Sequence, residues 1–155
     1  MGTHHKGTPA EVSALNSYIK LRRAAGAIDA RLVRDLTEHG LTETQFGVLE
    51  VLYHLGPMCQ RAIAAKQFTS GANMTMVVNN LEKSGLVRRV RSKEDRRQYF
   101  VELTAEGRGL IRRIFPGHVQ RIVDAFGALT REEQSQLSVL CRKLGLSNAS
   151  DRAED

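Results

Sequence analysis

The side chains best suited to chemistry lie between residues 70 and 83. A helix over 71–84 places four apolar residues on one face, which must point into a core. They are Met74, Val77, Val78 and Leu81. The rest of the helix carries short hydrogen-bonding groups, which fit base edges in the major groove of DNA, where Asn binds adenine and apolar groups contact thymine methyls. The residues predicted to contact DNA are Ser70, Asn73, Thr75, Met76, Asn79, Asn80 and Lys83.

The segment after this helix alternates like two paired strands, at 86–90 and 99–103, with a charged loop at Ser92–Arg97 between them. The loop is free to enter a minor groove, where the narrow-groove potential attracts arginine. Asp95 is expected to hold the guanidinium two residues further on in one orientation. The alternative for that pair is a surface ion pair that contributes almost nothing. The arginines predicted to contact DNA are Arg91, Arg96 and Arg97.

The positive charge of the chain is concentrated beside these elements. The 155 residues carry a formal net charge of +6, and the window from Lys83 to Arg97 alone holds seven basic and two acidic residues. A concentrated basic patch indicates a polyanionic partner such as double-stranded DNA. Two binding functions fit: sequence-specific recognition, or a non-specific architectural role. Phosphate contacts alone would favour Lys and Arg on the helix over 71–84, which carries Asn and Thr instead.

A helix-turn-helix would present the helix over 71–84 to DNA. Cys59 to about Gln67 is predicted as the first helix of that motif, and Phe68–Gly71 as the turn, with Thr69 or Ser70 as the N-cap. Gly85 should end the second helix. Two strands alone are marginally stable, so the hairpin that follows must pack against the helices as a wing.

Long helices are predicted before this lobe. Thr8 begins one with a capping box and a proline at its first position, and this helix runs to about His39 and ends at Gly40. A helix of roughly 30 residues spans about 45 Å. Because a small domain cannot cover that length alone, part of it should meet another helix or another subunit. Thr42 begins a second helix that ends near Leu55.

Two more helices are predicted after the wing. The first starts near Thr104 and contains Pro116 and Gly117, which should kink or split it. The second starts at Thr130 and should end at Gly145. The predicted fold is mostly α with a small two-stranded β-wing, a winged helix-turn-helix with long terminal dimerisation helices. Its segments are an N-terminal dimerisation helix at 1–40, a DNA-binding lobe at 41–104, C-terminal dimerisation helices at 105–146 and a disordered tail at 147–155.

The order and residues of these elements resemble the MarR family of bacterial transcriptional regulators. The matching stretches are LTETQFGVLEVL, MTMVVNNLEKSGLVRR, SKEDRRQYFVELTAEG and LTREEQSQLSVLCRKLG, between about Leu41 and Gly145. The resemblance implies an obligate homodimer with interlocking terminal helices, a pseudo-palindromic operator, and repression relieved by a small molecule or an oxidant. It also implies an Asp-x-Arg motif in the wing, at Asp95 and Arg97, with the arginine in the minor groove. Two recognition helices that reach successive major grooves, about 34–36 Å apart, likewise require a twofold dimer.

Two kinds of signal could release such a protein from DNA. A small aromatic or apolar effector could bind where the dimerisation helices meet the DNA-binding lobe, although each candidate lining residue also fits an ordinary core or surface role. Alternatively, oxidation of Cys59 at a helix start could move the DNA-binding helices; a small apolar residue at a cap explains Cys59 equally well. Cys141 lies on an apolar stripe and is predicted to be core. The candidate lining residues are Tyr18, His39, Phe46, Tyr53, His54 and His118.

Other classes of function find little support in the sequence. There is no glycine-rich phosphate loop and no credible Ser/His/Asp set, so we do not expect an enzyme. The five histidines show no metal-ligand spacing, and no cofactor or metal is expected. No apolar run approaches the roughly 20 residues of a membrane span, so no membrane partner is expected. Without a secretory segment, a cytoplasmic location is expected.

Overall fold

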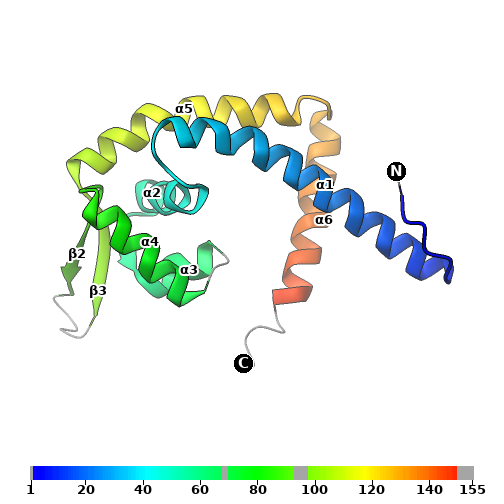
Figure 1. Ribbon diagram of the computed structural model, residues 1–155, viewed down its shortest axis with the longest axis horizontal. Helices are drawn as coiled ribbons and strands as arrows, with labels where there is room; N and C mark the ends of the chain where they lie inside the picture. The colour runs from blue at the N-terminus through cyan, green and yellow to red at the C-terminus, as the bar shows by residue number, and fades with distance from the viewer. Residues whose placement is uncertain (1, 68–69, 93–97, 150–155) are drawn as a thin grey trace. The chain divides into compact units, whose positions relative to one another are not determined.

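The computed structural model describes residues 2–67, 70–92 and 98–149. The chain divides into two compact units, one up to Val119 and one from Gln120 onwards, so helix α5 contributes residues to both. In chain order, the elements are α1 (Pro9–Glu38), α2 (Glu43–Leu55), β1 (Met58–Cys59), α3 (Gln60–Lys66), α4 (Gly71–Lys83), β2 (Val87–Arg91), β3 (Tyr99–Leu103), α5 (Ala105–Phe126) and α6 (Arg131–Ala149) (Figure 1).

Side-chain caps determine where the helices begin. Thr8 and Thr42 each form the predicted capping box, in which the threonine hydroxyl accepts from the third helical N–H and that residue's side chain accepts from the threonine N–H. The hydrogen bond from the Thr8 backbone, followed by the contact with His5, lowers the pKa of Glu11. Thr130 and Glu133 make the same pair of bonds before α6, at 3.2 and 2.8 Å.

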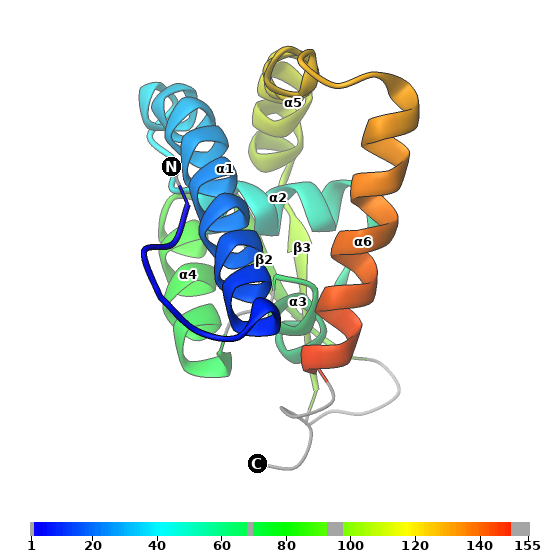
Figure 2. The same ribbon diagram turned by 90° about the vertical axis from the view of Figure 1, so that its right-hand side faces the viewer.

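The core of the first unit lies between α2, α3, α4 and the sheet. Figure 1 and Figure 2 both show α2 lying above α3 and α4. Helix α4 contributes the four apolar residues predicted from its periodicity, all buried. They pack with side chains from α2, α3, β2, β3 and the first half of α5. The largest fully buried side chains are Leu36, Leu49, Leu52, Ile63, Met74, Leu81, Ile111, Val48, Val78, Val87 and Val101.

The sheet has three antiparallel strands in the order β1-β3-β2, rather than the two predicted. The predicted hairpin is present, with Val87 opposite Leu103 and Arg91 opposite Tyr99. The additional strand, β1, is only two residues long and pairs Met58 with Val101. A strand that short has no alternation to detect, which is why the sequence did not indicate it. Its pairing places β3 in the middle of the sheet and joins the wing to the start of α3.

One predicted helix boundary in the C-terminal region was wrong. Of the two outcomes expected at Pro116, a kink or a split, the split does not occur, because Pro116 lies inside one continuous helix. Gly145 does not end α6, which continues to Ala149, so residues 147–149 of the predicted tail are helical. A glycine ends a helix when it adopts positive φ, as Gly40 and Gly85 do here, at 71° and 70°. Gly145 is not among the glycines with positive φ, so its backbone can continue the helix.

Candidate nucleic-acid interface

Helix α4 is held so that one face is buried and the other is open. Its N-cap is Ser70, whose hydroxyl accepts from Asn73 N at 3.3 Å. Met74, Val78 and Leu81 are completely buried, whereas Met76, on the opposite side, is 60% exposed. The predicted division of this helix into a core face and a free face is therefore confirmed. Every residue predicted to contact DNA in this segment is exposed: Ser70, Asn73, Thr75, Met76, Asn79, Asn80 and Lys83.

The wing begins on paired strands that fix its base. Ser92 N donates to Gln98 O at 2.9 Å, closing the hairpin beyond the last strand pair. The guanidinium of Arg91 lies over the ring of Tyr99, 5.6 Å from its centroid, which holds this predicted DNA-contacting side chain against its own strand pair. Asp95, Arg96 and Arg97 lie outside the described residues, so their predicted pairing and DNA contacts stay predictions.

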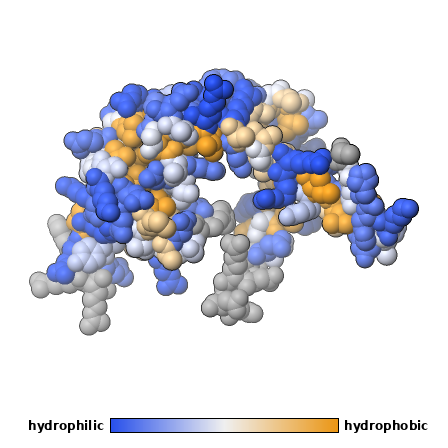
Figure 3. All heavy atoms as spheres, viewed as in Figure 1, coloured by the Kyte–Doolittle hydropathy of each residue, from blue (hydrophilic) through white to orange (hydrophobic). Residues whose placement is uncertain are grey.

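Two arginines of the basic window already have acidic partners. Arg88, exposed on β2, pairs with Glu102 on β3 at 2.6 Å. Arg89, whose side chain is 25% exposed, pairs with Glu82 near the end of α4. Among the described residues, Lys83 and Arg91 have no carboxylate at ion-pair distance. Among the described residues of the basic window, the charge available to an anion therefore comes from Lys83 and Arg91 and not from Arg88 or Arg89. Figure 3 shows hydrophilic side chains gathered where the end of α4 meets β2.

Arg89 also makes contacts that the sequence did not reveal. Its Nη2 donates to Asn79 Oδ1 at 2.6 Å and to Gln60 Oε1 at 3.3 Å. Gln60 Nε2 in turn donates to the hydroxyl of Thr75 at 2.6 Å, and that hydroxyl donates to Gly71 O at 2.9 Å. Two residues predicted as free base readers, Asn79 and Thr75, thus have part of their hydrogen-bonding capacity engaged within the protein. No sequence pattern links residues 10 to 29 positions apart in this way.

Four of the six candidate sensor residues make ring contacts in the first unit, in two groups. The ring of Phe46 lies 4.3 Å from that of buried His118, and the ring of His54 lies 4.8 Å from that of Phe115 and 5.0 Å from that of Tyr53. The other two candidates are His39, the C-cap of α1, and Tyr18, which is exposed on α1. These ring contacts fit ordinary packing as well as a binding role.

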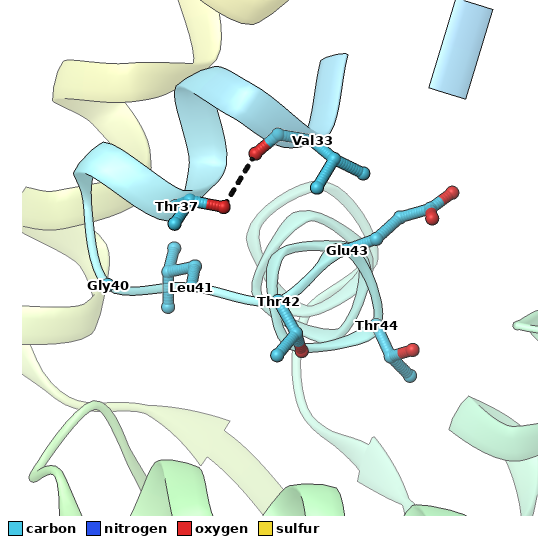
Figure 4. A pocket seen from close by; sticks show the side chains of 7 residues that line it. All are labelled: Val33, Thr37, Gly40, Leu41, Thr42, Glu43 and Thr44. Atoms are coloured by element: carbon cyan, nitrogen blue, oxygen red, sulfur yellow. Dashed lines mark hydrogen bonds between the residues drawn. The ribbon is translucent and has the colours of Figure 1, made fainter. Parts of the chain in front are cut away.

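A separate pocket of about 570 Å³ lies where α1 turns into α2 (Figure 4). Thr37 on its wall donates to the carbonyl of Val33 at 2.9 Å. None of the six predicted lining residues borders it. The lining residues are Val33, Thr37, Gly40, Leu41, Thr42, Glu43 and Thr44.

The two cysteines differ from each other in environment. Cys59 is half-buried at the N-cap of α3, where its side chain makes no capping hydrogen bond. Cys141 on α6 is exposed, so its prediction as core was wrong for the single chain. The apolar stripe that suggested a core position lies on a helix with no buried residue among those described.

No group of three or more His, Cys, Asp or Glu side chains in the described ranges is arranged to hold a metal ion. Of the described helices, none is both long and apolar enough to cross a bilayer.

Comparisons with known proteins extend over most of the chain. A sequence model described as MarR family matches residues 39–98. A Bacillus subtilis protein named uncharacterized HTH-type transcriptional regulator YkoM is 36% identical over 133 residues, covering 86% of this chain and 86% of that protein. Sco3205 of Streptomyces coelicolor, a MarR family regulator solved in complex with DNA, aligns with 28% identity and a TM-score of 0.81 over 93% of this chain and 91% of that one. BpsR of Bordetella bronchiseptica, whose DNA binding is regulated by 6-hydroxynicotinic acid, aligns with 27% identity and a TM-score of 0.75 over 83% of this chain and 98% of that one.

Proposed function

The chain belongs to the MarR family of transcriptional regulators, and from that premise we propose that it is a sequence-specific repressor. In this proposal it binds a pseudo-palindromic operator as a homodimer. The observation that carries the proposal is the open face of α4, where Met76 and Asn79 are exposed while Met74 is completely buried. Uncharged polar and methyl-bearing groups on a projecting helix match base edges better than they match phosphates. The solved complex of Sco3205 with DNA supports the same use of the fold.

A dimer follows from the spacing of DNA grooves and is supported by apolar surface on both terminal helices. A palindromic site presents its half-sites about one helical turn apart, which a twofold pair of α4 helices can match. Hydrophobic side chains are visible along the N-terminal half of α1 (Figure 3), where Leu15, Tyr18 and Leu21 are exposed. Exposed stripes of this kind commonly mark protein–protein interfaces.

The experiment that tests the proposal is selection of DNA from a random pool, followed by gel shifts. We expect a two-part symmetric sequence, bound about 10³-fold or more tightly than random duplex. Equal affinity for every duplex would overturn sequence-specific recognition and leave the architectural role. That role would show steep salt dependence without sequence preference. The scarcity of Lys and Arg on the exposed face of α4 argues against it.

Arg97→Ala should weaken operator binding by about 1–3 kcal/mol without dissociating the dimer, because the arginine would contact DNA and not the partner chain. Gel shifts measure the affinity, and light scattering the oligomeric state. The control is Arg88→Ala, which removes a nearby positive charge that is already paired with Glu102. If Arg97→Ala binds the operator as tightly as the parent protein does, the wing makes no important contact with DNA.

We propose further that a small aromatic acid releases the repressor, as the regulation of BpsR by 6-hydroxynicotinic acid suggests for a relative of this fold. Such a ligand acts only through different affinities for the free and DNA-bound conformations. The α1–α2 pocket is our candidate site, because it borders both a long terminal helix and the DNA-binding lobe. Oxidation of Cys59 is the alternative signal, supported by its position at the start of α3.

A compound that binds the free protein should raise its melting temperature and lower its operator affinity together. At a concentration 100 times the dissociation constant, the added stability is about 2.7 kcal/mol. A thermal-shift screen of aromatic acids, beginning with 6-hydroxynicotinic acid, is followed by gel shifts with each compound that binds. Val33→Trp should fill the pocket and abolish the shift. The redox alternative would be favoured if hydrogen peroxide released the parent protein from its operator but did not release Cys59→Ser, and if no aromatic acid released either protein.

A further inference from the structure

The amide of Asn79 has a fixed hydrogen-bonding direction. A guanidinium has donors and no acceptor, so the atom of Asn79 that faces Arg89 Nη2 at 2.6 Å must be the carbonyl oxygen. The amide nitrogen, Nδ2, therefore keeps both of its hydrogens for other partners. None of the residues that the structure describes accepts a hydrogen bond from it. Asn79 is exposed, so these donors are available to a molecule that approaches α4.

Arg89 is itself held firmly enough to impose this direction. Its Nη1 pairs with Glu82, three residues beyond Asn79 on the same helix, and its backbone N–H donates to the other carboxylate oxygen of Glu82 at 3.0 Å. A second Nη2 contact reaches Gln60 on α3. The planar fork of an arginine can satisfy several acceptors at once, which a lysine ammonium does less well. The guanidinium thus joins β2, α3 and α4 at the residue predicted to read DNA.

A fixed donor reads bases differently from a freely rotating asparagine. A free amide can donate and accept together, the pattern that binds the N7 and N6 atoms of adenine. With the oxygen held toward Arg89, the group offered outward is the amide nitrogen, a donor, which matches the acceptors on guanine, on adenine N7 and on thymine O4. The major-groove edge of cytosine offers only the N4 donor. Two donors facing each other would be left unpaired.

We propose that Arg89 is a positioning residue that presents Asn79 to DNA as a hydrogen-bond donor. As a result, the protein binds less tightly when the base that faces Asn79 is cytosine. The proposal rests on the proposed function, since it requires α4 to face base edges. It assigns the specificity of that position to a side chain on β2 that itself need not touch DNA.

The neighbouring arginine provides a matched control. Arg88 lies next to Arg89 on the same strand and pairs with a glutamate at 2.6 Å, so it resembles Arg89 in charge and in type of partner. It makes no hydrogen bond to α4 among the residues that the structure describes. Substitution of Arg88 therefore changes the net charge as substitution of Arg89 does, without touching Asn79.

The experiment measures binding of the full-length protein to its selected operator and to every single-base replacement in both half-sites. The variants are Asn79→Asp, Arg89→Gln, Arg89→Lys and Arg88→Gln, with melting curves to check folding. Asp is nearly isosteric with Asn and can still accept from Arg89, but it presents an acceptor outward. We expect the parent to disfavour cytosine at one position by about tenfold. Asn79→Asp should reverse that preference toward cytosine or adenine, whose amino groups donate.

Both Arg89 variants should lose the preference at that position while keeping the preferences at the other positions, and Arg88→Gln should keep all of them. Arg89→Lys preserves a positive charge beside Glu82, so it reports on base preference even if Arg89→Gln fails to fold. Unchanged base preferences in Arg89→Lys, or a uniform loss of affinity for all sequences in Asn79→Asp, would overturn the proposal. Failure of the parent protein to prefer any sequence would instead overturn the proposed function on which it rests.

Discussion

Leu140→Glu should convert the protein to monomers and lower operator affinity by at least about a hundredfold. Helix α6 has no buried residue among those described, and four of its large apolar side chains are more than half exposed. A charge placed on that surface must lose its hydration when the surface is covered, without a partner to compensate. Monomers must bind the two half-sites separately, which forfeits the roughly 10²–10⁴-fold gain of linked binding. The exposed side chains are Val139, Leu140, Leu144 and Leu146.

Light scattering and gel shifts on the same preparation measure the two effects. The control is Ser138→Glu, which adds the same charge to the same helix on the side opposite Leu140, at 100° per residue. That variant should remain dimeric and bind normally. A dimeric Leu140→Glu protein with the operator affinity of the parent would show that this face of α6 is not the interface and would leave α1 to provide it.

The sequence predicted best those features that are encoded by neighbouring residues. The capping boxes at Thr8 and Thr42 each need only four consecutive positions, and both form as expected. The buried face of α4 follows from a periodicity that a window of about a dozen residues contains. In each case the interacting residues are close together in the sequence, so the local structure could be inferred from the sequence pattern.

Features that depend on distant parts of the chain could not be predicted in this way. β1 is a strand only because Met58 happens to lie beside Val101. The contacts of Arg89 join three elements that sequence spacing does not relate. The same limit applies to the candidate site: the open face of α4 was predictable, but the direction in which Asn79 can hydrogen-bond was not.

Apolar residues that a partner would cover are a third case. The stripe on α6 was interpreted as core at Cys141, yet Cys141 is exposed in the chain. A hydrophobic pattern reports that a face avoids water, and it does not report whether the covering surface belongs to the same chain. The predicted dimerisation role of α6 and the error at Cys141 therefore come from the same observation.

Gly107→Ala should lower the free energy of unfolding by about 3 kcal/mol or more, a fall of roughly 6–12 °C in melting temperature. A Cβ at Gly107 would lie 1.9 Å from the carbonyl oxygen of Leu86 and 2.9 Å from its carbonyl carbon. That oxygen accepts from Thr104 N at 3.1 Å, and the Thr104 hydroxyl donates to Gly85 O at 2.6 Å. The start of α5 is therefore fixed against the chain that leaves α4, and a methyl group must displace backbone rather than a flexible side chain.

Gly109→Ala tests this cause directly, because the two glycines are two residues apart in the same helix. A Cβ at Gly109 meets nothing within 4 Å, and alanine favours a helix over glycine by about 1 kcal/mol. Gly109→Ala should therefore melt at or above the temperature of the parent. Since helix propensity changes equally in both variants, the difference between their melting temperatures isolates the contact with Leu86. Equal melting temperatures for the two would contradict the close approach of α5 to the end of the helix-turn-helix.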